Sequence, residues 1–363
     1  MKLKQENLDA LIISSSPNIS YLTGFISRDS LFLISRRGNT YITDSRYIEE
    51  AKNNLQGATA IKKINGSIFK IIADTCKGLN IKRIGFEGRY LPFDEYKKIK
   101  EELNKPRHQL VYSKVDFPNW CGGKDLELIS THGLIEELRQ IKRVGELKKI
   151  KKAVKITIDA LTFIKGFILP GRKEIEVAAE LERFIRHKGA CGSAFNIIVA
   201  SGPNSSFPHH LTSQRKIKNN EPVLIDIGVD YLGYKSDLTR VFFLGTITSA
   251  VRRIYGIVLG AQDRAIRKIK PGININKIDA AARQYITQKG YGGFFGHSLG
   301  HGIGLEVHEE PRISAKEKGI LKPGMLFTIE PAIYLPERFG IRIEDMVLVT
   351  DNGCEVLSGA LYK

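Results

Sequence analysis

The sequence has few cysteines and no long uninterrupted apolar run. Its 363 residues include four cysteines, scattered without a Cys-x-x-Cys pair: Cys76, Cys121, Cys191 and Cys354. Their spacing argues against a disulfide framework and against a zinc–thiolate site. The longest apolar stretches, such as 8–13 and 158–168, are interrupted by polar residues and are much shorter than the roughly 20 residues that cross a bilayer. No apolar segment with a small-residue cleavage site follows Met1, so we expect a cytoplasmic protein without membrane association.

Acidic residues are scarce relative to basic ones. The chain has 39 aspartates and glutamates against 56 lysines and arginines, for a formal net charge of +17. Such a charge is compatible with a polyanion partner such as nucleic acid. However, the basic residues occur along the whole chain, without an aromatic-interleaved basic block or zinc-finger spacing. We therefore interpret the charge as a lysine-rich solvated surface and expect no nucleic-acid partner.

The chain is long enough for two domains, and its pattern changes along its length. Short strands and helices alternate before residue 115, which predicts an α/β domain. The predicted strands are 8–14, 30–34, 40–43 and 83–86, and the predicted helices are 44–55 and 92–103. The turn-rich segment 35–39 predicts a hairpin between the second and third strands. Because the pattern loosens over 113–133, we place the domains at 1–125 and 126–363.

The second half of the chain combines longer helices with strand runs. Apolar residues recur at helical spacing over 134–158, and we expect Gly145 to divide this stretch into two helices. Further helices are predicted at 250–269 and 278–289. Strand runs bounded by glycine and proline are 196–200, 222–227, 239–244, 325–333 and 342–350.

Two aspartates eleven positions apart flank a predicted hairpin. The apolar residues 223–225 lead into Asp226, and a turn at 231–233 leads back to Asp237. A hairpin folded midway places the two carboxylates nearly opposite each other, at the edge of a dry core. Like charges held that close require a cation or a shared proton. Alone, such a pair is also typical of a turn or a surface feature.

Three histidines occur within twelve residues of a glycine-rich segment, FGHSLGHGIGLEVHEEP. They are His297, His301 and His308, out of eight histidines in the chain. Glycine lets the backbone approach a ligand closely, and imidazole serves as a metal ligand and as a general acid or base near neutral pH. The clustering therefore favours a functional site over separate structural histidines.

Two glutamates lie in or directly after apolar strand runs. Glu330 follows Phe-Thr-Ile, and Glu344 lies in Ile-Arg-Ile-Glu-Asp, where the two-residue period of a strand puts Arg342 on the same face. Glutamate is rarely buried unless it is paired or binds a metal. A salt bridge would also explain each glutamate separately.

Together, these segments resemble the dinuclear site of the pita-bread metallopeptidases, which include methionine aminopeptidase, Xaa-Pro aminopeptidase and prolidase. The matching motifs DIGVDYLGYKSDLTR, HSLGHGIGLEVHEEP, TIEP and IRIED follow the family's order, and the resemblance covers about residues 131–363. NISYLTGF at 18–25 and TDSRY at 43–47 resemble the creatinase/prolidase N-terminal domain, which methionine aminopeptidase lacks. The resemblance therefore implies a creatinase-type α/β N-terminal domain, an α+β pita-bread catalytic domain and the proline-specific branch of the family.

The resemblance implies five ligands for two divalent metal ions: Asp226, Asp237, His301, Glu330 and Glu344. Asp237 and Glu344 would bridge the two ions. Asp226 would complete one ion, and His301 and Glu330 would complete the other. An oxygen-rich set suits harder ions, so Mn²⁺ is our first choice, with Co²⁺, Fe²⁺ and Zn²⁺ as alternatives. A water bridging the ions would be the nucleophile, and Glu330 would also shuttle its proton.

The resemblance also implies residues beside the substrate. The stretch 202–209, GPNSSFPH, is similar to the family's GxNxxxPH, which places His209 by the substrate, with His210 as a second candidate. His297 and His308 match the two histidines that flank the metal ligand. They would hydrogen-bond the substrate carbonyl and the charge that develops in the transition state.

Two further positions match the family's substrate side. Arg342 matches an arginine that would meet a substrate carboxylate or hold a carboxylate ligand, and Tyr334 would flank the proline pocket. The implied reaction is hydrolysis of the bond between an N-terminal residue and proline. The nitrogen of that bond carries no N–H, so a pocket shaped for the ring and a metal-activated water suit it.

Three alternatives stay open at this point. A relative could keep the fold as a non-catalytic binding protein, or could be a creatinase-like hydrolase that works without metal; the intact ligand set argues against both. Within the peptidases, a prolidase cuts only dipeptides, whereas an aminopeptidase P accepts longer peptides. The resemblance further implies a homodimer and a peptide substrate with proline in the second position.

Overall fold

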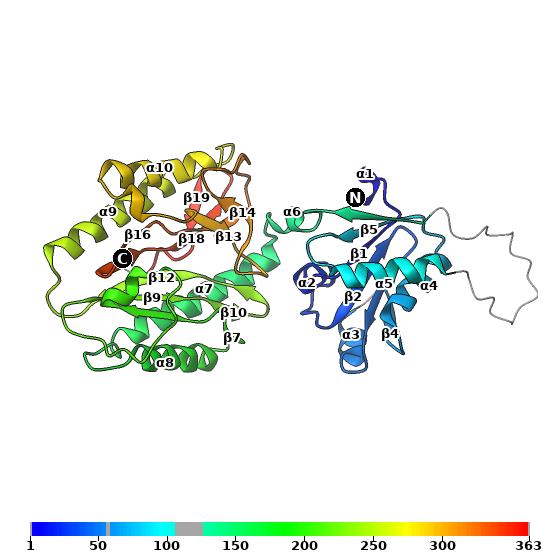
Figure 1. The fold of residues 1–363 in the computed structure, drawn as a ribbon, viewed down its shortest axis with the longest axis horizontal. Helices are drawn as coiled ribbons and strands as arrows, with labels where there is room; N and C mark the ends of the chain where they lie inside the picture. The colour runs from blue at the N-terminus through cyan, green and yellow to red at the C-terminus, as the bar shows by residue number, and fades with distance from the viewer. Residues whose placement is uncertain (1, 56–58, 106–125, 362–363) are drawn as a thin grey trace, which may run out of the picture. The chain divides into compact units, whose positions relative to one another are not determined.

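The computed structural model describes residues 2–55, 59–105 and 126–361 (Figure 1). Its contacts divide the chain into two compact units, Met1–Ile135 and Glu136–Lys363. The division falls after Ile135 rather than after residue 125, because strand β6 (Glu127–Thr131) pairs with the sheet of the first unit. Cys121 and most of the loosened segment 113–133 lie outside the described residues.

The first unit is built around one mixed sheet in the order β4-β3-β2-β1-β5-β6. The predicted hairpin is confirmed, because the second and third strands pair antiparallel. The strands are β1 (Ala10–Ile13), β2 (Ser30–Ser35), β3 (Asn39–Thr43), β4 (Thr59–Lys63) and β5 (Arg83–Glu87), with β6. The helices are α1 (Lys2–Gln5), α2 (Ser16–Thr23), α3 (Ile48–Asn54), α4 (Ile68–Gly78) and α5 (Phe93–Asn104). The helix predicted from residue 44 begins at Ile48, because Asp44 accepts a bond from the Arg46 backbone in a turn.

The motif NISYLTGF contributes a buried side chain that connects a helix of this unit to its sheet. Asn18 is buried in α2 and donates to Glu87 at the end of β5, at 2.5 Å. The other oxygen of Glu87 accepts from the backbone N–H groups of Ser14 and Ser15, at 2.7 and 2.8 Å. The carboxylate therefore ties the end of β1, the start of α2 and the end of β5 together.

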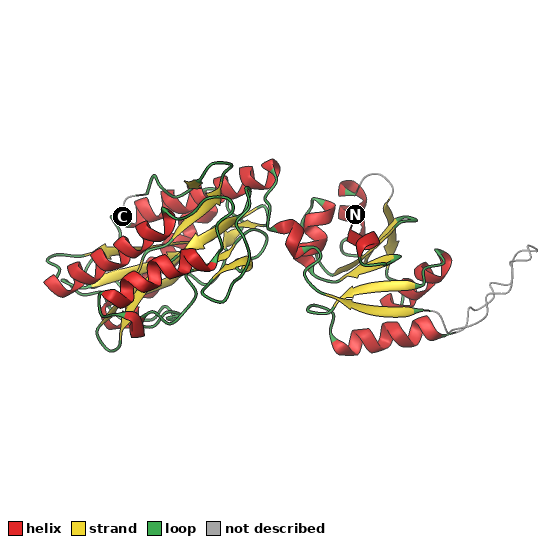
Figure 2. Cartoon of the chain, turned by 90° about the horizontal axis from the view of Figure 1, so that it is seen from above, coloured by secondary structure: helices red, strands yellow, loops and turns green. Residues whose placement is uncertain are grey.

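The second unit has two apolar cores, one on each side of its strands. Helices α7 (Val144–Ile164) and α8 (Glu174–His187) pack on one side, and α9 (Ser249–Ile266) and α10 (Asn276–Gln288) on the other, as Figure 1 shows. Figure 2 shows the helices of the chain in red and its strands in yellow. Within the described ranges, no helix is both long and apolar enough to cross a membrane.

The strands of this unit form small antiparallel sheets. One has the order β12-β9-β8, with β8 (Ile198–Ser201), β9 (Pro222–Ile227) and β12 (Leu238–Phe243). A second has the order β14-β13-β15-β18-β19, with β13 (Gly300–Gly302), β14 (Glu309–Ile313), β15 (Leu326–Ile329), β18 (Asp345–Val349) and β19 (Cys354–Val356). The hairpins are β16 (Ala332–Leu335) with β17 (Phe339–Arg342), and β10 (Val229–Tyr231) with β11 (Tyr234–Lys235). The other edge of β10 pairs with β7 (Gly192–Ser193).

Two strands predicted as continuous are each broken in the structure. The run 325–333 divides into β15 and β16 at Glu330-Pro331, and the run 342–350 divides into β17 and β18 at Ile343-Glu344. Proline supplies no N–H to a ladder, and the buried amide of Gln262 donates to the carbonyls of Ile329 and Ile343 at 3.0 and 3.1 Å. Both glutamates therefore lie where the chain leaves one sheet and enters another.

The helical stretch 134–158 does divide in two, but not at Gly145. Short helix α6 (Glu136–Arg139) ends before Ile141, which forms an isolated bridge to Met325. Helix α7 then begins at Val144, where Glu146 accepts from the Arg143 backbone N–H at 3.0 Å. Gly145 is the second residue of that helix, so the capping glutamate, rather than the glycine, marks the boundary.

Candidate metal centre and its surroundings

The two aspartates lie at the end of the β9–β12 hairpin. Asp226 is in β9, directly opposite Thr239, and Asp237 immediately precedes β12. The intervening turn is at Leu232 and Gly233, which both have positive φ. The predicted hairpin is therefore confirmed, and it brings both carboxylates to the same end of the sheet.

His301 is the central residue of strand β13, between two glycines that allow close backbone packing. A Cβ atom on Gly300 would collide with the Thr328 carbonyl, and one on Gly302 would collide with the Glu310 carbonyl. The backbone N–H of His301 donates to the Thr328 hydroxyl at 3.1 Å. The glycines of this motif therefore hold the histidine strand tightly against its neighbours.

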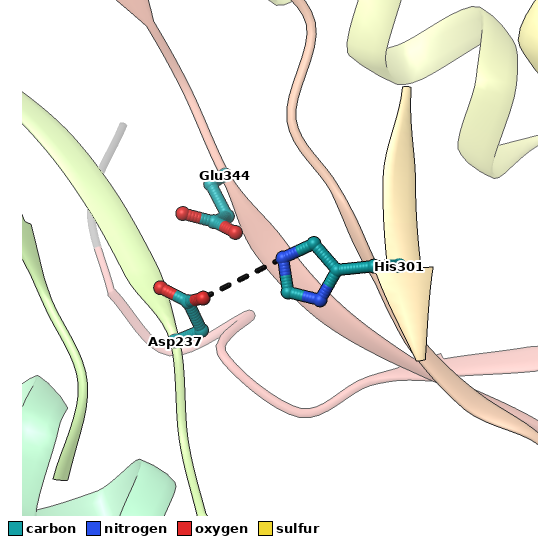
Figure 3. A group of neighbouring side chains, drawn as sticks. All are labelled: Asp237, His301 and Glu344. Atoms are coloured by element: carbon teal, nitrogen blue, oxygen red, sulfur yellow. Dashed lines mark ion pairs between the residues drawn. The ribbon is translucent and has the colours of Figure 1, made fainter. Parts of the chain in front are cut away.

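The side chains from these distant segments converge on one place. His301 Nε2 is 3.3 Å from Glu330 Oε1 and 3.7 Å from Asp237 Oδ2. Asp237, His301 and Glu344 each offer one ligand atom within 4.8 Å of the others, and Figure 3 shows their side chains pointing toward one another. Asp226 joins the group on the other side, since its charge and that of Glu344 both act on Asp237.

The site carries more buried negative charge than its protein cations balance. Burial, followed by the charges of neighbouring carboxylates, raises the pKa of Asp237 and of Glu344 well above the usual range. Burial also raises the pKa of Glu330 to about 8, although Arg342 opposes the shift. Among the described residues, Asp226 Oδ1 and Asp237 Oδ1 are buried without a hydrogen-bond partner. Such orphaned oxygens are what a cation would satisfy.

Arg342 is the buried cation of this group. Its Nη2 donates to Asp226 Oδ2 at 2.6 Å, and its Nε donates to the Thr239 hydroxyl at 3.1 Å. Thr239 in turn donates to Glu344 Oε2 at 2.7 Å. The expected common side of Arg342 and Glu344 is thus observed, with Thr239 between them. In this arrangement the guanidinium holds a carboxylate of the site.

The histidines around His301 have different partners. His297 Nδ1 lies 2.7 Å from the Ser298 carbonyl and therefore carries its proton, so His297 Nε2 accepts from the Tyr334 hydroxyl at 3.3 Å. Burial lowers the pKa of both His297 and His301 to about 4, which leaves their rings neutral. His308 lies with its ring 4.1 Å from that of His301, and burial, then the charge of His209, lowers its pKa.

The structure separates the two adjacent histidines, of which the sequence ranked His209 first and His210 second. His210 Nε2 lies 2.9 Å from Glu174 Oε2, away from the carboxylate group. His209 instead lies near enough for its charge to act on His297 and His308. Tyr334 is buried beside them, and its hydroxyl accepts from Arg342 Nη1 at 2.7 Å.

Sequence reasoning missed two threonines that support the acidic residues. Thr239 stands two positions after Asp237, and Thr328 stands two positions before Glu330, to which it donates at 3.1 Å. The two-residue period of a strand would have found both, since it places them on the face of the acidic residue. Arg312 was also missed. It is exposed, donates to the Ser298 hydroxyl at 2.7 Å, and acts electrostatically on the neighbouring histidines.

Four carboxylates and one imidazole lie in a buried cluster with orphaned oxygens, which is a donor set that suits divalent cations. Comparison with known proteins agrees. Residues 148–351 match metallopeptidase family M24, and residues 1–117 match the creatinase/prolidase N-terminal domain. The chain therefore belongs to metallopeptidase family M24, with a creatinase-type N-terminal domain and a pita-bread catalytic domain.

Individual relatives match along nearly their whole length. The uncharacterized peptidase YqhT of Bacillus subtilis is 40% identical over 96% of this chain and 93% of its own. The Xaa-Pro dipeptidase of Pyrococcus horikoshii is 36% identical over 98% of this chain and 94% of its own. Among solved structures, the Xaa-Pro dipeptidase from Bacillus anthracis superposes with a TM-score of 0.90 at 39% identity, covering 98% of this chain and 94% of that one. The X-Pro aminopeptidase from Thermotoga maritima has a TM-score of 0.86 at 35% identity, covering 99% and 97%.

Proposed function

We propose that this protein hydrolyses the peptide bond between an N-terminal residue and proline in a metal-dependent reaction. The observation that carries the proposal is the convergence of Asp237, His301 and Glu344 in a buried cluster, within an M24 chain. Relatives that span nearly the whole chain are named Xaa-Pro dipeptidase and X-Pro aminopeptidase.

We propose two divalent ions as the cofactor, with Mn²⁺ first and Co²⁺, Fe²⁺ or Zn²⁺ as alternatives. The ligands would be Asp226, Asp237, His301, Glu330 and Glu344, with Asp237 and Glu344 shared between the ions. The fit rests on the surplus of buried carboxylate, the neutral imidazole and the orphaned aspartate oxygens. Bound divalent ions would lower the pKa of a water and polarise the substrate carbonyl.

The chain's own residues would orient the substrate and move protons. Glu330 would take the proton of the attacking water, since its carboxylate lies in the cluster, 3.3 Å from His301 Nε2. His308 and His209 would face the substrate and donate hydrogen bonds to its carbonyl oxygen as negative charge develops there. His297 keeps its proton on Nδ1, so its Nε2 would accept a hydrogen bond from the substrate in exchange for the one from Tyr334.

Arg342 and Tyr334 would help to shape the substrate pocket. Arg342 orients the carboxylate of Asp226, and the Tyr334 ring would lie against the proline ring. Proline has no N–H and a fixed ring, so a pocket without a required N–H acceptor suits it. We also propose a homodimer, which a mass measurement in solution would test.

A comparison of Xaa-Pro, Xaa-Pro-Xaa and Xaa-Ala peptides tests the function. We expect cleavage of the first two classes with Mn²⁺ added, and loss of cleavage after chelation. Asp237→Asn should abolish turnover while the fold persists. Cleavage of Xaa-Ala alone would exclude the proline-specific assignment. Near-normal turnover by the variant would exclude the ligand set.

A non-catalytic binding protein and a creatinase-like hydrolase are not favoured. Both alternatives predict that some of the five acidic and histidine positions have been lost, whereas all five are present in the sequence, and Asp237, His301 and Glu344 each offer a ligand atom within 4.8 Å of the others. Metal content together with peptide hydrolysis distinguishes these alternatives.

A further inference from the structure

The loop that carries His209 is held at its base by a buried carboxylate that belongs to neither the metal set nor the substrate set. Glu174 is the first residue of α8, and its side chain is 0% exposed. Its two oxygens accept hydrogen bonds from four residues that span the loop: Ser201, Asn204, His210 and Ser213.

The bonds to Glu174 come from both ends of the loop. Oε1 accepts from the Ser201 backbone N–H at 2.8 Å, from the Ser201 hydroxyl at 2.7 Å and from Asn204 Nδ2 at 3.0 Å. Oε2 accepts from the Ser213 hydroxyl at 2.6 Å and from its backbone N–H at 3.2 Å. Because Ser201 ends β8 and Ser213 follows the two histidines, one carboxylate closes the loop.

The other side of the loop rests on strand β17. The Gly340 N–H donates to the Ser205 hydroxyl at 2.9 Å, and a Cβ atom on Gly340 would collide with the Ser205 carbonyl. Arg342 Nη1 lies 3.3 Å from the Pro208 carbonyl. The loop is therefore clamped between Glu174 and the strand that carries the site arginine.

The same clamp gives the two adjacent histidines different directions. The ring of His210 is tied to Glu174 at 2.9 Å, while the charge of His209 acts on His297 and His308. Glu174 stays ionised despite its burial. Burial raises its pKa, but the hydrogen bonds from Ser213, Ser201 and His210 outweigh this and lower it.

We propose that Glu174 is a positioning residue that holds the loop 201–213 so that His209 stands beside His297 and His308. This inference rests on the proposed role of His209 in the reaction. In this proposal Glu174 affects turnover without touching the substrate or a metal ion, whereas the ligand carboxylates would bind the metal directly.

The test is a double-mutant cycle between Glu174→Gln and His209→Ala, measured on an Xaa-Pro substrate with Mn²⁺. A glutamine keeps the shape but replaces one acceptor oxygen with a donor amide that faces other donors. We expect Glu174→Gln to lower kcat/KM by roughly tenfold or more, as loss of a supporting shell does, while the Mn²⁺ affinity measured calorimetrically stays unchanged. In the His209→Ala background, we expect Glu174→Gln to have almost no further effect.

Glu176→Gln is the matched control, because it makes the same change two positions along the same helix at an exposed side chain, and glutamine can still accept from the Lys173 backbone N–H that Glu176 caps. It should leave kcat/KM unchanged. Hydrogen exchange of the peptide 201–213 should rise in Glu174→Gln and not in Glu176→Gln. If Glu174→Gln does not fold, Ser213→Ala removes one hydroxyl donor to the carboxylate and should show the same coupling more weakly.

The outcomes separate the inference from the proposed function. Loss in His209→Ala with no loss in Glu174→Gln overturns the positioning role and leaves the proposed function standing. Losses that multiply in the double mutant, or a weakened Mn²⁺ affinity in Glu174→Gln, also overturn it, because Glu174 would then act elsewhere. No loss in His209→Ala overturns the assignment of His209 and the inference with it, whereas hydrolysis by the wild type still supports the reaction itself.

Discussion

Arg342 and Asp226 form a buried ion pair in which Nη2 lies 2.6 Å from Oδ2. The arginine is 4% exposed and the aspartate 9%. Breaking such a pair leaves an uncompensated charge in the interior. In this protein the remaining carboxylate would belong to a group that already contains Asp237 and Glu344 with raised pKa values. The pair therefore stabilises the metal-free cluster.

Arg342→Gln should destabilise the metal-free protein by roughly 3 kcal/mol or more, because Asp226 loses its only guanidinium partner among the described contacts. Saturating Mn²⁺ should recover part of that loss, since bound cations replace the missing charge. Urea unfolding with chelator and with Mn²⁺ measures both quantities, and Arg338→Gln, at an exposed position, is the control. An equal loss in both conditions would show that the arginine does not act by balancing this carboxylate.

We expect the metal-free protein to become less stable as pH rises, which is the opposite of the usual effect of carboxylates. The pKa of Glu330 is raised from 4.5 to about 8 in the folded state, so between these values the folded chain binds a proton that the unfolded chain has released. Stability therefore falls as pH rises through this window. The raised pKa values of Asp237 and Glu344 act in the same direction.

Glu330→Gln isolates that contribution, because glutamine resembles the protonated acid and does not titrate. Urea unfolding in chelator between about pH 5 and 8 should show a smaller loss of stability with rising pH in the variant than in the wild type. Glu337→Gln, on the exposed turn between β16 and β17, serves as the control. Parallel curves for wild type and Glu330→Gln would contradict the raised pKa.

We expect Arg312 to favour Xaa-Pro dipeptides over longer peptides. It is exposed in β14, is held by Ser298, and its charge acts on His301 and His308. A guanidinium there would bind the free carboxylate of an Xaa-Pro dipeptide. Arg312→Ala should raise KM for Xaa-Pro roughly tenfold and leave KM for the Xaa-Pro amide nearly unchanged, the loss of about one charge-assisted contact. Equal effects on both substrates would favour an enzyme that does not read the carboxylate.

Gln262 should be needed for stability although it lies outside the reaction. Its amide is 0% exposed and donates to the carbonyls of Ile329 and Ile343, next to the two strand breaks. Gln262→Leu should cost roughly 2–3 kcal/mol, since it leaves buried carbonyls without these donors. Thermal unfolding measures the loss, with Gln288→Leu on the exposed face of α10 as the control. Similar melting temperatures for the two variants would contradict the role of the amide.

Much of the site could be predicted because each part carries a local signal. Asp226 and Asp237 flank a hairpin whose turn glycine and strand lengths are visible in the sequence, and the observed pairing opposes Asp226 to Thr239. The glycines around His301 mark close backbone approach, which the packing against Thr328 explains. These signals are local because hairpin register and steric room depend on neighbouring residues.

The strand breaks could not be predicted in the same way. The runs 325–333 and 342–350 are mostly apolar, and their periodicity alone does not show that each changes sheet at a glutamate. The break depends on partners far away in the chain: β15 pairs with β18, β16 pairs with β17, and Gln262 of α9 satisfies the carbonyls between them.

The order of residues along the chain was enough to predict which acids and histidines belong to one centre, because each stands in its own short motif. It ranked His209 before His210 and left two roles for Arg342, and only the folded structure shows which partners these side chains take. Those assignments depend on Glu174 and Asp226, which lie 36 and 116 positions away from their partners. Contacts between such distant positions form only when the sheets and helices pack, so the direction of a side chain within a motif is a property of the folded molecule.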